Sequence, residues 1–359
     1  MNSDDSTYYV DWHTLRDFAI EALMKASVLP EDAFIIADTL VETELRGTDT
    51  HGIARLAPYI RMISEGNMNP RPNLSIVKET PITALIDADN GVGNLICVKA
   101  TEIAIEKARN SGVSIVGVKN STHCGALVYY PMMALKLDMM GFMTVNGPPV
   151  IPAYGGTTKL LASNPYAVAI PAGDELPIVI DMALTAVAMG KIRRKAILGE
   201  KLPLGWALDR NGKATEDAEE AVNHGFFTWI GDHKGYSLAV LANILCGVLT
   251  GSAFGPQTFP PWHMAAEYGS ELLRQGHFIM VLAVENFMPI DEFQNRMDAM
   301  IRETKTSKLA KGFDRIYLPG ERGFECKAQR LKTGIPISQL VWKSLMRVKK
   351  ALGLSSSLE

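Results

Sequence analysis

A strand, a helix and a second strand follow one another closely near residue 100, and this order constrains the fold most strongly. Thr83–Asp87 is a short apolar run with strand character, Ala100–Asn110 is helical and closed by Gly112, and Val113–Val118 is again strand-like. Strands that alternate with helices are typical of an α/β domain. Similar apolar runs predict four more strands, at Phe142–Val145, Ala167–Ile170, Ile178–Ile180 and Phe278–Val284.

Both ends of the chain are predicted to be helical. Apolar residues recur at helical spacing in each terminal segment, and proline and glycine mark the helix ends. The apolar stretch Ser237–Leu249 predicts a buried helix in between. The helices expected near the ends are Trp12–Met24, Pro30–Arg46, Leu56–Glu65, Asp291–Lys305 and Pro336–Leu352.

Composition excludes several classes of protein. The 359 residues are 47% apolar and 21% charged with a net charge of −3, which does not suit a nucleic-acid partner. No apolar run is long enough for a transmembrane helix, and the acidic segment Met1–Asp5 does not resemble a signal peptide. Four cysteines lie far apart without a CxxC pair, so we expect reduced thiols in the cytoplasm and no structural metal: Cys97, Cys124, Cys246 and Cys326.

A standard dinucleotide-binding fingerprint is missing. Gly91–Ile96 has two of the three glycines, but no following acid and no strand-to-helix context. A phosphate-binding GxxxxGK[ST] loop is also absent from the sequence. Any nicotinamide cofactor must therefore be bound by something other than a Rossmann unit.

The segment Glu44–Arg55 concentrates polar chemistry directly after a predicted helix. His51 is a candidate proton donor, because imidazole both gives and takes a proton near neutral pH. Arg55 lies four residues on, which places it near His51 if the backbone is helical, and its guanidinium suits a carboxylate. A 2-oxo acid reductase needs this combination. The alternative is a solvated junction in which His51 caps backbone groups.

Asn120–Ala126 follows a predicted strand, where open α/β sheets often bind ligands. His123 beside Cys124 suggests a metal, yet neither has partner ligands at a suitable spacing. A nucleophilic Cys124 is a second interpretation, and a turn in which Ser121 and Thr122 cap a helix near Ala126 is a third.

Three further segments carry polar groups that suit a ligand. Asp181 ends an apolar strand and is either the N-cap of a following helix or a carboxylate that orients a catalytic imidazole. Ser163–Pro165 presents polar groups to a ligand or forms a tight turn. Lys234 lies at the start of a predicted helix, where it could reach a phosphate.

Together these segments resemble the malate/L-lactate dehydrogenase family of the second type, from the Arg46–Arg55 motif to Pro319–Arg322. This family includes ureidoglycolate and sulfolactate dehydrogenases, 2,3-diketo-L-gulonate reductases and Δ1-piperideine-2-carboxylate reductases. The resemblance implies a non-Rossmann NAD(P)-binding domain with a mixed sheet, as in sulfolactate dehydrogenase. It also implies a helical domain built from both terminal segments.

The resemblance assigns roles to individual residues. His51 is the expected acid, Asp181 supports it, and His123 is the alternative acid/base. Arg55 is expected to hold the substrate carboxylate, with Thr50 and Ser163 nearby. Thr50 replaces a frequent serine and Ser163 a common threonine, so both keep the hydroxyl. The expected cofactor contacts are Asp181, Met182, Ala183, Leu184, Thr185, His233, Lys234, Gly320, Glu321 and Arg322.

The resemblance also implies an organisation for the whole chain. Residues 1–118 with 305–359 are expected to form the substrate and dimerisation domain, and residues 119–304 the nucleotide-binding domain. A homodimer is expected, with NAD(H) favoured over NADP(H), no metal, and neither nucleic-acid nor membrane partners.

We therefore predict an NAD(P)-dependent enzyme that moves hydride between nicotinamide and C2 of a small 2-oxo or 2-hydroxy acid. One alternative is a reductase of a cyclic 2-imino acid, which needs the same acid and anchor. Another is a non-catalytic carboxylate- or nucleotide-binding protein, which would need no acid.

Overall fold

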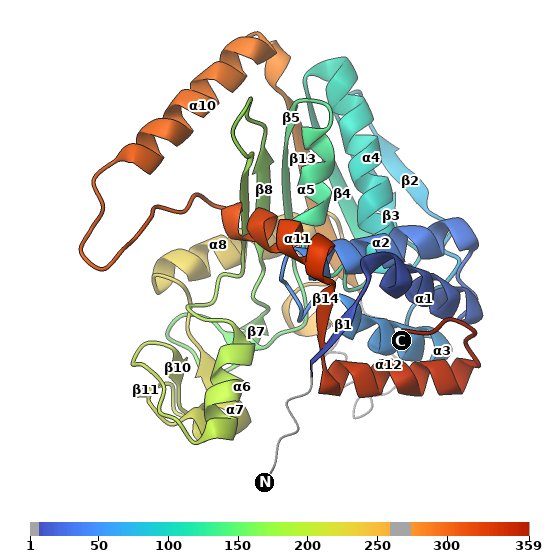
Figure 1. Cartoon of the computed structure of the whole chain (residues 1–359), viewed down its shortest axis with the longest axis vertical. Coiled ribbons are helices and arrows are strands. Elements are labelled where there is room, and N and C mark those ends of the chain that lie inside the picture. Colours follow the sequence, from blue (N-terminus) through green and yellow to red (C-terminus); the bar gives the residue numbers. More distant parts are fainter. Residues whose placement is uncertain (1–6, 259–273, 359) are drawn as a thin grey trace.

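A seven-stranded mixed sheet forms the centre of the molecule in a computed structural model that describes residues 7–258 and 274–358 (Figure 1). The strand order is β2-β3-β4-β13-β5-β8-β9, and within it β3 and β4 are parallel while the other neighbours are antiparallel. The strands are β2 (Ser75–Glu79), β3 (Thr83–Asp87), β4 (Val113–Ser121), β5 (Met139–Val145), β8 (Tyr166–Ile170), β9 (Ile178–Met182) and β13 (Gln275–Ala283). A Rossmann domain is built on a run of several parallel strands, whereas the parallel run in this sheet ends after β3 and β4, which confirms the expected non-Rossmann fold.

Two helices cover one face of the sheet, α4 (Gly93–Ser111) over β4 and β13, and α5 (Tyr129–Leu135) over β5 and β8. Buried side chains of α4 and of alternate strand positions make the main core of this layer. Helix α4 begins at Gly93 and is the first element after β3, so the expectation that Gly91–Ile96 lacks a strand-to-helix context was wrong. Gly112 ends α4 with a left-handed φ of 81°, which glycine adopts without strain.

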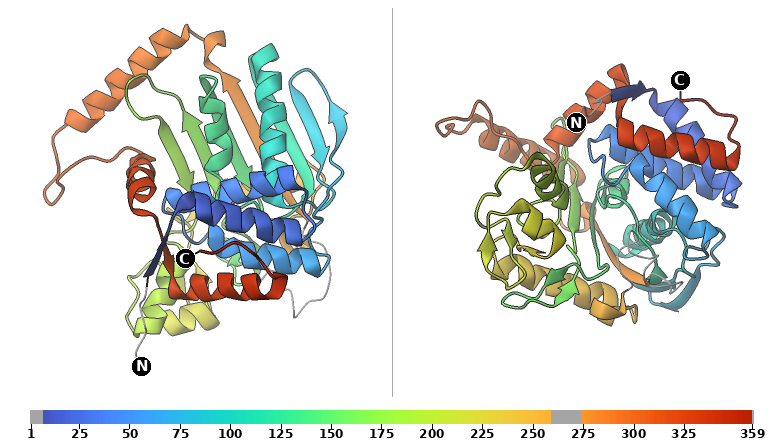
Figure 2. Two further views of the ribbon diagram at one scale, coloured as in Figure 1. Left: turned by 45° about the vertical axis from the view of Figure 1, so that its right-hand side comes forward. Right: turned by 90° about the horizontal axis from the view of Figure 1, so that it is seen from below.

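The two ends of the chain pack together beside the sheet (Figure 2). Strand β1 (Thr7–Val10) pairs antiparallel with β14 (Ile335–Ser338). The surrounding helices share one apolar core: α1 (Trp12–Lys25), α2 (Pro30–Leu45), α3 (Leu56–Ser64) and α12 (Gln339–Leu352). The expected C-terminal helix was wrong in its first residues, because Pro336 and its neighbours form β14.

Smaller elements form the rest of the described chain. Short strands and helices occupy residues 151–230, and α8 then leads into a π-helical turn. These elements are β6 (Ile151–Pro152), β7 (Lys159–Leu161), α6 (Met189–Leu198), β10 (Ala207–Leu208), β11 (Ala214–Thr215), α7 (Ala218–Asn223), β12 (Phe226–Phe227), α8 (His233–Asn243) and η2 (Ile244–Val248). Two helices follow β13, α10 (Ile290–Thr306) and α11 (Glu321–Thr333), and 3-10 turns lie at Ile53–Arg55, Gly255–Gln257 and Val284–Asn286.

The seven-stranded sheet contains strands from both sides of the domain boundary expected at residue 118. The proposed division into two domains therefore stays a prediction. None of the helices in the described residues is both long and apolar enough to cross a bilayer.

Candidate active site

A cavity of about 410 Å³ gathers residues from five segments of the chain. Six predicted site residues line it: Thr50, His51, Ser163, Asp181, Ala183 and Gly320. Sequence reasoning missed several others that line the same walls: Arg46, Thr48, Gly125, Val128 and Gly323. Charge, hydroxyls and open backbone are thus concentrated in one concave space.

His51 lies in the turn that follows α2. Its backbone N–H donates to the Thr48 carbonyl at 2.9 Å, and its Nδ1 lies 2.9 Å from the Thr50 hydroxyl oxygen. Burial lowers the pKa of His51 to about 4, and the positive charge of Arg55 contributes. The imidazole is therefore neutral near pH 7, which is the form that can accept a proton.

His123 stacks near His51, with 5.7 Å between ring centroids. Its Nδ1 lies 2.7 Å from the Tyr59 hydroxyl and 3.3 Å from the backbone N–H of Gly125. Because an amide can only donate, Nδ1 is the acceptor and the ring proton lies on Nε2. Burial lowers the pKa of His123 well below its usual value, and burial raises the pKa of Tyr59.

Arg55 follows His51 through a short 3-10 turn rather than along an α-helix. Its guanidinium is nevertheless close enough to lower the pKa of both His51 and His123. Burial lowers the pKa of Arg55 itself, and the charge of Arg193 adds to that effect. The predicted proton donor, alternative donor and carboxylate anchor therefore lie together.

Asp181 enters the cavity from the end of β9. It is open to the cavity yet surrounded by protein, and this burial raises its pKa to about 6, opposed by the Val128 N–H and the charge of Arg46. No hydrogen bond joins Asp181 to either histidine in the described residues. The helix-cap interpretation is wrong, because the next helix begins only at Met189.

Arg46 is the most informative residue that sequence reasoning left without a role. It is buried, its guanidinium lies 4.4 Å from the Phe324 ring centroid, and its Nη1 has no hydrogen-bond partner. A buried cationic donor without a partner beside a cavity suits an anionic ligand group. No spacing signal in the sequence distinguishes Arg46 from its neighbour Arg55.

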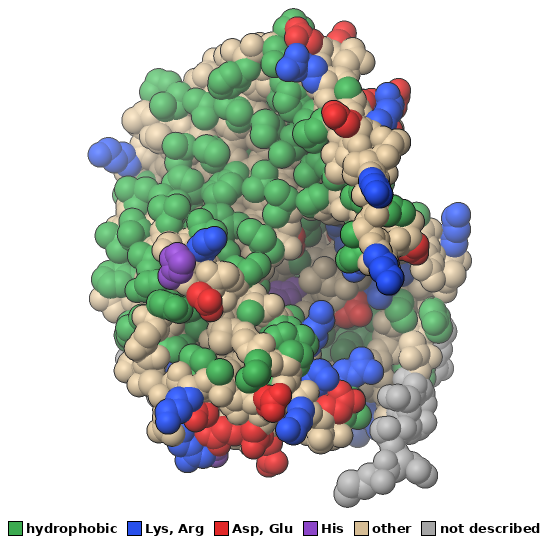
Figure 3. All heavy atoms as spheres, turned by 90° about the vertical axis from the view of Figure 1, so that its left-hand side faces the viewer, with side chains coloured by type: hydrophobic (Ala, Val, Ile, Leu, Met, Phe, Trp, Pro, Cys, Tyr) green, Lys and Arg blue, Asp and Glu red, His purple; other side chains and the backbone are tan. Residues whose placement is uncertain are grey.

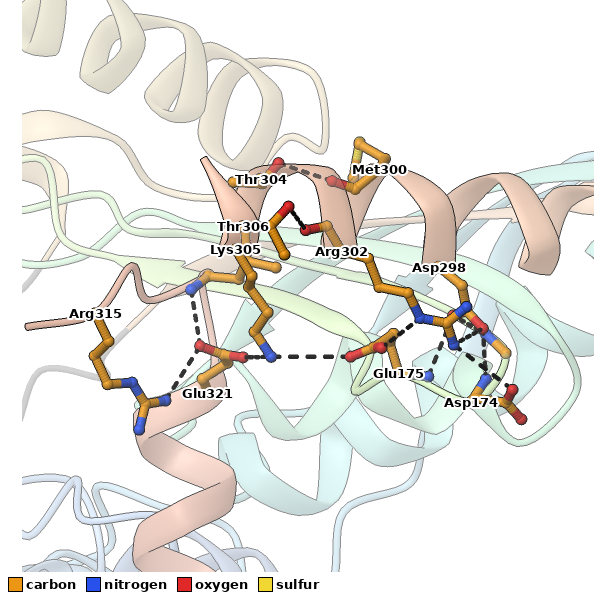
Figure 4. Close-up of polar contacts among 12 residues, drawn as sticks. Asp174, Glu175, Asp298, Met300, Arg302, Thr304, Lys305, Thr306, Arg315 and Glu321 are labelled. Atoms are coloured by element: carbon orange, nitrogen blue, oxygen red, sulfur yellow. Dashed lines mark hydrogen bonds and ion pairs between the residues drawn. The ribbon is translucent and has the colours of Figure 1, made fainter. Parts of the chain in front are cut away.

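The Pro319–Arg322 segment packs tightly against β9. Gly320 has φ of 94°, and a Cβ there would lie 2.7 Å from the Val179 Cβ, so only glycine fits. The Glu321 carboxylate is buried and paired with Lys305 and Arg315 (Figure 4). Glu321 therefore holds α11 against α10, and its carboxylate already has partners.

The remaining predicted cofactor residues lie outside the cavity lining. Met182 is exposed, Leu184 is fully buried against Trp229, and Thr185 forms a bridge to Trp229. His233 and Lys234 are exposed at the start of α8, as predicted. Arg322 is exposed and stacks on Tyr317 at 4.4 Å.

One further interpretation of Asn120–Ala126 changes. Ser121 and Thr122 do not cap a helix near Ala126, since α5 begins at Tyr129. Thr122 instead accepts a hydrogen bond from the Gly93 N–H at 3.0 Å and so fixes the start of α4. The loop that carries His123 is thus tied to the core.

Known proteins are similar to this chain in sequence and fold over nearly its whole length. The family model described as malate/L-lactate dehydrogenase matches residues 10–346. The chain belongs to the malate/L-lactate dehydrogenase family. It is 36% identical to malate dehydrogenase of Pyrococcus horikoshii, over 98% of this chain and 97% of that protein.

Two other members of the family are similar over similar lengths. Ureidoglycolate dehydrogenase (NAD(+)) of Escherichia coli O157:H7 is 30% identical, over 93% of each chain. The solved structure of sulfolactate dehydrogenase from Methanocaldococcus jannaschii superposes with a TM-score of 0.90 at 34% identity, covering 97% of this chain and 98% of that one. The chain thus shares a non-Rossmann fold with proteins that are named dehydrogenases, which is consistent with its lack of the dinucleotide fingerprint.

Proposed function

We propose that this family member is an NAD(P)-dependent dehydrogenase that moves hydride between nicotinamide and C2 of a small 2-hydroxy acid. The observation that carries the proposal is the meeting of His51, His123 and Arg55 beside Asp181 and a cavity. Relatives named malate and ureidoglycolate dehydrogenase support the substrate class.

His51 is the proposed proton carrier. In the oxidising direction its neutral imidazole accepts the hydroxyl proton as the C2–H bond is lost as hydride. In the reducing direction the imidazolium returns that proton to the developing alkoxide. The Thr50 hydroxyl at 2.9 Å fixes the ring orientation. His123 is the alternative carrier, held by Tyr59 at 2.7 Å.

Arg55 is the proposed anchor for the substrate carboxylate, because a planar guanidinium binds a carboxylate in two places and fixes its plane. Thr50 and Ser163 are proposed to contact the same substrate, since both line the cavity. Once the carboxylate neutralises Arg55, one cause of the low pKa of His51 disappears. Substrate binding therefore favours protonation of His51.

Asp181 is proposed to stabilise the imidazolium through the field of its carboxylate, because both residues line one cavity without a hydrogen bond between them. Its pKa of about 6 leaves it ionised in neutral solution.

The residues present fit a nicotinamide dinucleotide. The buried Arg46 Nη1 without a partner suits an anionic group, and Gly320 and Gly323 line the same cavity. When bound, the nicotinamide supplies or accepts the hydride. We propose Asp181–Thr185, His233, Lys234 and Gly320–Arg322 as its contacts, and we favour NAD(H), in line with the relative named with NAD(+).

The decisive experiment is oxidation of NADH and NADPH by the purified protein with oxaloacetate, pyruvate, 2,3-diketogulonate and Δ1-piperideine-2-carboxylate. We expect turnover of an open-chain 2-oxo acid with NADH. Turnover of only the cyclic imine would reassign the substrate class. Cofactor binding with no turnover of any compound, including the reverse reaction with the 2-hydroxy acids, would contradict the proposed activity.

We also propose a homodimer. The helix expected to be buried at Ser237–Leu249 instead exposes a row of large apolar side chains: Leu238, Leu241, Ile244, Val248 and Leu249. Figure 3 shows apolar side chains gathered over much of the face where α8 lies. An extended apolar surface of this kind marks a protein interface. We call these five residues the α8 patch.

We propose a reducing compartment such as the cytoplasm. All four cysteines are free, three of them buried, as in proteins that keep their thiols reduced.

A further inference from the structure

Two thiols and an imidazole meet in the core directly behind the candidate active site. Cys97 lies on α4, Cys124 follows His123 in the loop after β4, and His277 lies on β13. Their ligand atoms all lie within 4.8 Å of one another, and all three residues are buried. The proposed hydroxy-acid chemistry uses none of these three side chains.

His277 is the unusual member of this cluster. It is 0% exposed, and in the described residues neither Nδ1 nor Nε2 pairs with a nitrogen or oxygen atom, although the Cys124 thiol lies beside the ring. Burying a polar group without a good partner carries a free-energy cost, so such groups are rare in folded proteins. A ligand that accepts electron pairs from one ring nitrogen and both sulfurs would remove this cost.

The two sulfurs are not equivalent. The Cys97 thiol lowers the pKa of Cys124, and the nearby His277 contributes, whereas burial raises the pKa of Cys97. Metals bind the thiolate form, so both sulfurs must be deprotonated in the complex.

We propose that Cys97, Cys124 and His277 bind one Zn²⁺ ion. Thiolate sulfur and imidazole nitrogen are the ligands that zinc prefers in structural sites. Two thiolates and a neutral imidazole balance a divalent cation, so the complex adds no net charge to the core, whereas Cu⁺ would leave one negative charge there. Each Zn–S bond replaces an S–H bond where the thiol is protonated, and that proton goes to solvent.

The ion would join three segments that are far apart in sequence. It would tie α4 and β13 to the loop that carries His123, because Cys124 is the next residue. No metal was predicted from the sequence because further metal ligands were sought close to Cys124 in the chain. The fold instead brings Cys97 and His277 to Cys124 from distant elements.

The first test measures metal in the reduced full-length protein. We expect about one zinc per chain after purification without chelator. After removal of zinc, Co²⁺ should give thiolate-to-cobalt charge-transfer absorption, and adding Zn²⁺ to the apoprotein should raise its Tm. None of these measurements depends on turnover, so the site can fail while the proposed function stands.

Variants identify the ligands. Cys97→Ser and His277→Gln should each weaken Zn²⁺ binding at least tenfold. Cys326→Ser is the matched control, since this thiol lies on α11 outside the cluster and should leave binding unchanged. No stoichiometric uptake by the wild-type protein, cobalt binding without sulfur charge transfer, or equal binding in the cluster variants would overturn the site. Uptake of Cu⁺ with exclusion of Zn²⁺ would overturn the choice of a divalent ion.

Discussion

Single residues in this site control the protonation of their neighbours. Arg55 lowers the pKa of both His51 and His123, and Arg46 opposes the rise in the pKa of Asp181 caused by burial. The groups proposed to move and stabilise one proton are therefore coupled to the two arginines proposed to bind anions. Binding of the substrate carboxylate at Arg55 then raises the pKa of His51, which is the direction that reduction needs.

The pH dependence of hydroxy-acid oxidation tests the role of Asp181. Because its pKa is raised to about 6, kcat/KM should rise as pH increases through 6 and then level off, when the carboxylate is ionised. Asp181→Asn should remove this inflection and lower the plateau roughly tenfold, or about 1.4 kcal/mol. Asp174→Asn, an exposed carboxylate before β9, is the control. An unchanged inflection at pH 6 in Asp181→Asn would refute the assignment.

The carboxylate anchor is tested by substitution of Arg55. A charge-assisted pair is worth about 1.5–3 kcal/mol, so Arg55→Ala should raise KM for the acid roughly 10- to 150-fold. The dissociation constant for NADH, measured by fluorescence, should not change. Arg61→Ala removes a half-exposed arginine of α3, the helix that follows Arg55, and should have little effect on either value. Equal losses in KM and cofactor affinity would instead indicate a damaged fold.

At the scale of elements, the turn that carries His51 is held from behind by Glu44 of α2. This carboxyl is buried, accepts a hydrogen bond from the Ile53 N–H at 2.8 Å, and lies near Arg330 of α11. Arg330 also donates to Asp49 at 2.7 Å. The position of His51 therefore depends on contacts between α2, the turn and α11.

Glu44 also makes stability depend on pH. Burial raises its pKa from 4.5 to about 8, with a contribution from Asp49. Because the folded-state pKa lies above the unfolded value, wild-type stability should fall as pH rises from about 4.5 to 8. Glu44→Gln keeps the acceptor for Ile53 and should remove roughly 2–4 kcal/mol of this decline, measured by urea unfolding at pH 5 and 8.

Glu44→Ala is the contrasting variant. It lacks both the titrating carboxyl and the acceptor, so relative to Glu44→Gln it should cost about 1–3 kcal/mol at both pH values and lower kcat. If Glu44→Gln showed the same pH dependence as the wild type, another group would be responsible.

The sequence predicted most of the sheet for a physical reason. Strands such as Val113–Val118 bury alternate residues, so their composition shows their structure. The proposed site residues come from the family resemblance, which links motifs in order. Arg46, Tyr59 and the partners of Cys124 were missed, since their importance arises from contacts between distant segments that no local pattern encodes.

At the scale of the whole molecule, one apolar helix is left partly uncovered. An all-apolar stretch usually indicates burial, which is why Ser237–Leu249 was predicted to be buried. In the described residues α8 and η2 bury Ala239, Ala242 and Cys246 against the rest of the chain but expose the α8 patch. We propose that this apolar pattern reflects an assembly rather than the core of the single chain.

The α8 patch should therefore control the oligomeric state. Burying each large apolar side chain contributes about 1.5–3 kcal/mol, and a charge at the centre of an interface removes that gain and adds a desolvation cost. Leu241→Asp with Ile244→Asp should raise the dimer dissociation constant at least 100-fold and give a monomer in light scattering. Ile197→Asp is the matched control, because this isoleucine of α6 is 85% exposed outside the patch. A dimer that survives the double substitution, or one that Ile197→Asp dissociates, would place the interface on another face.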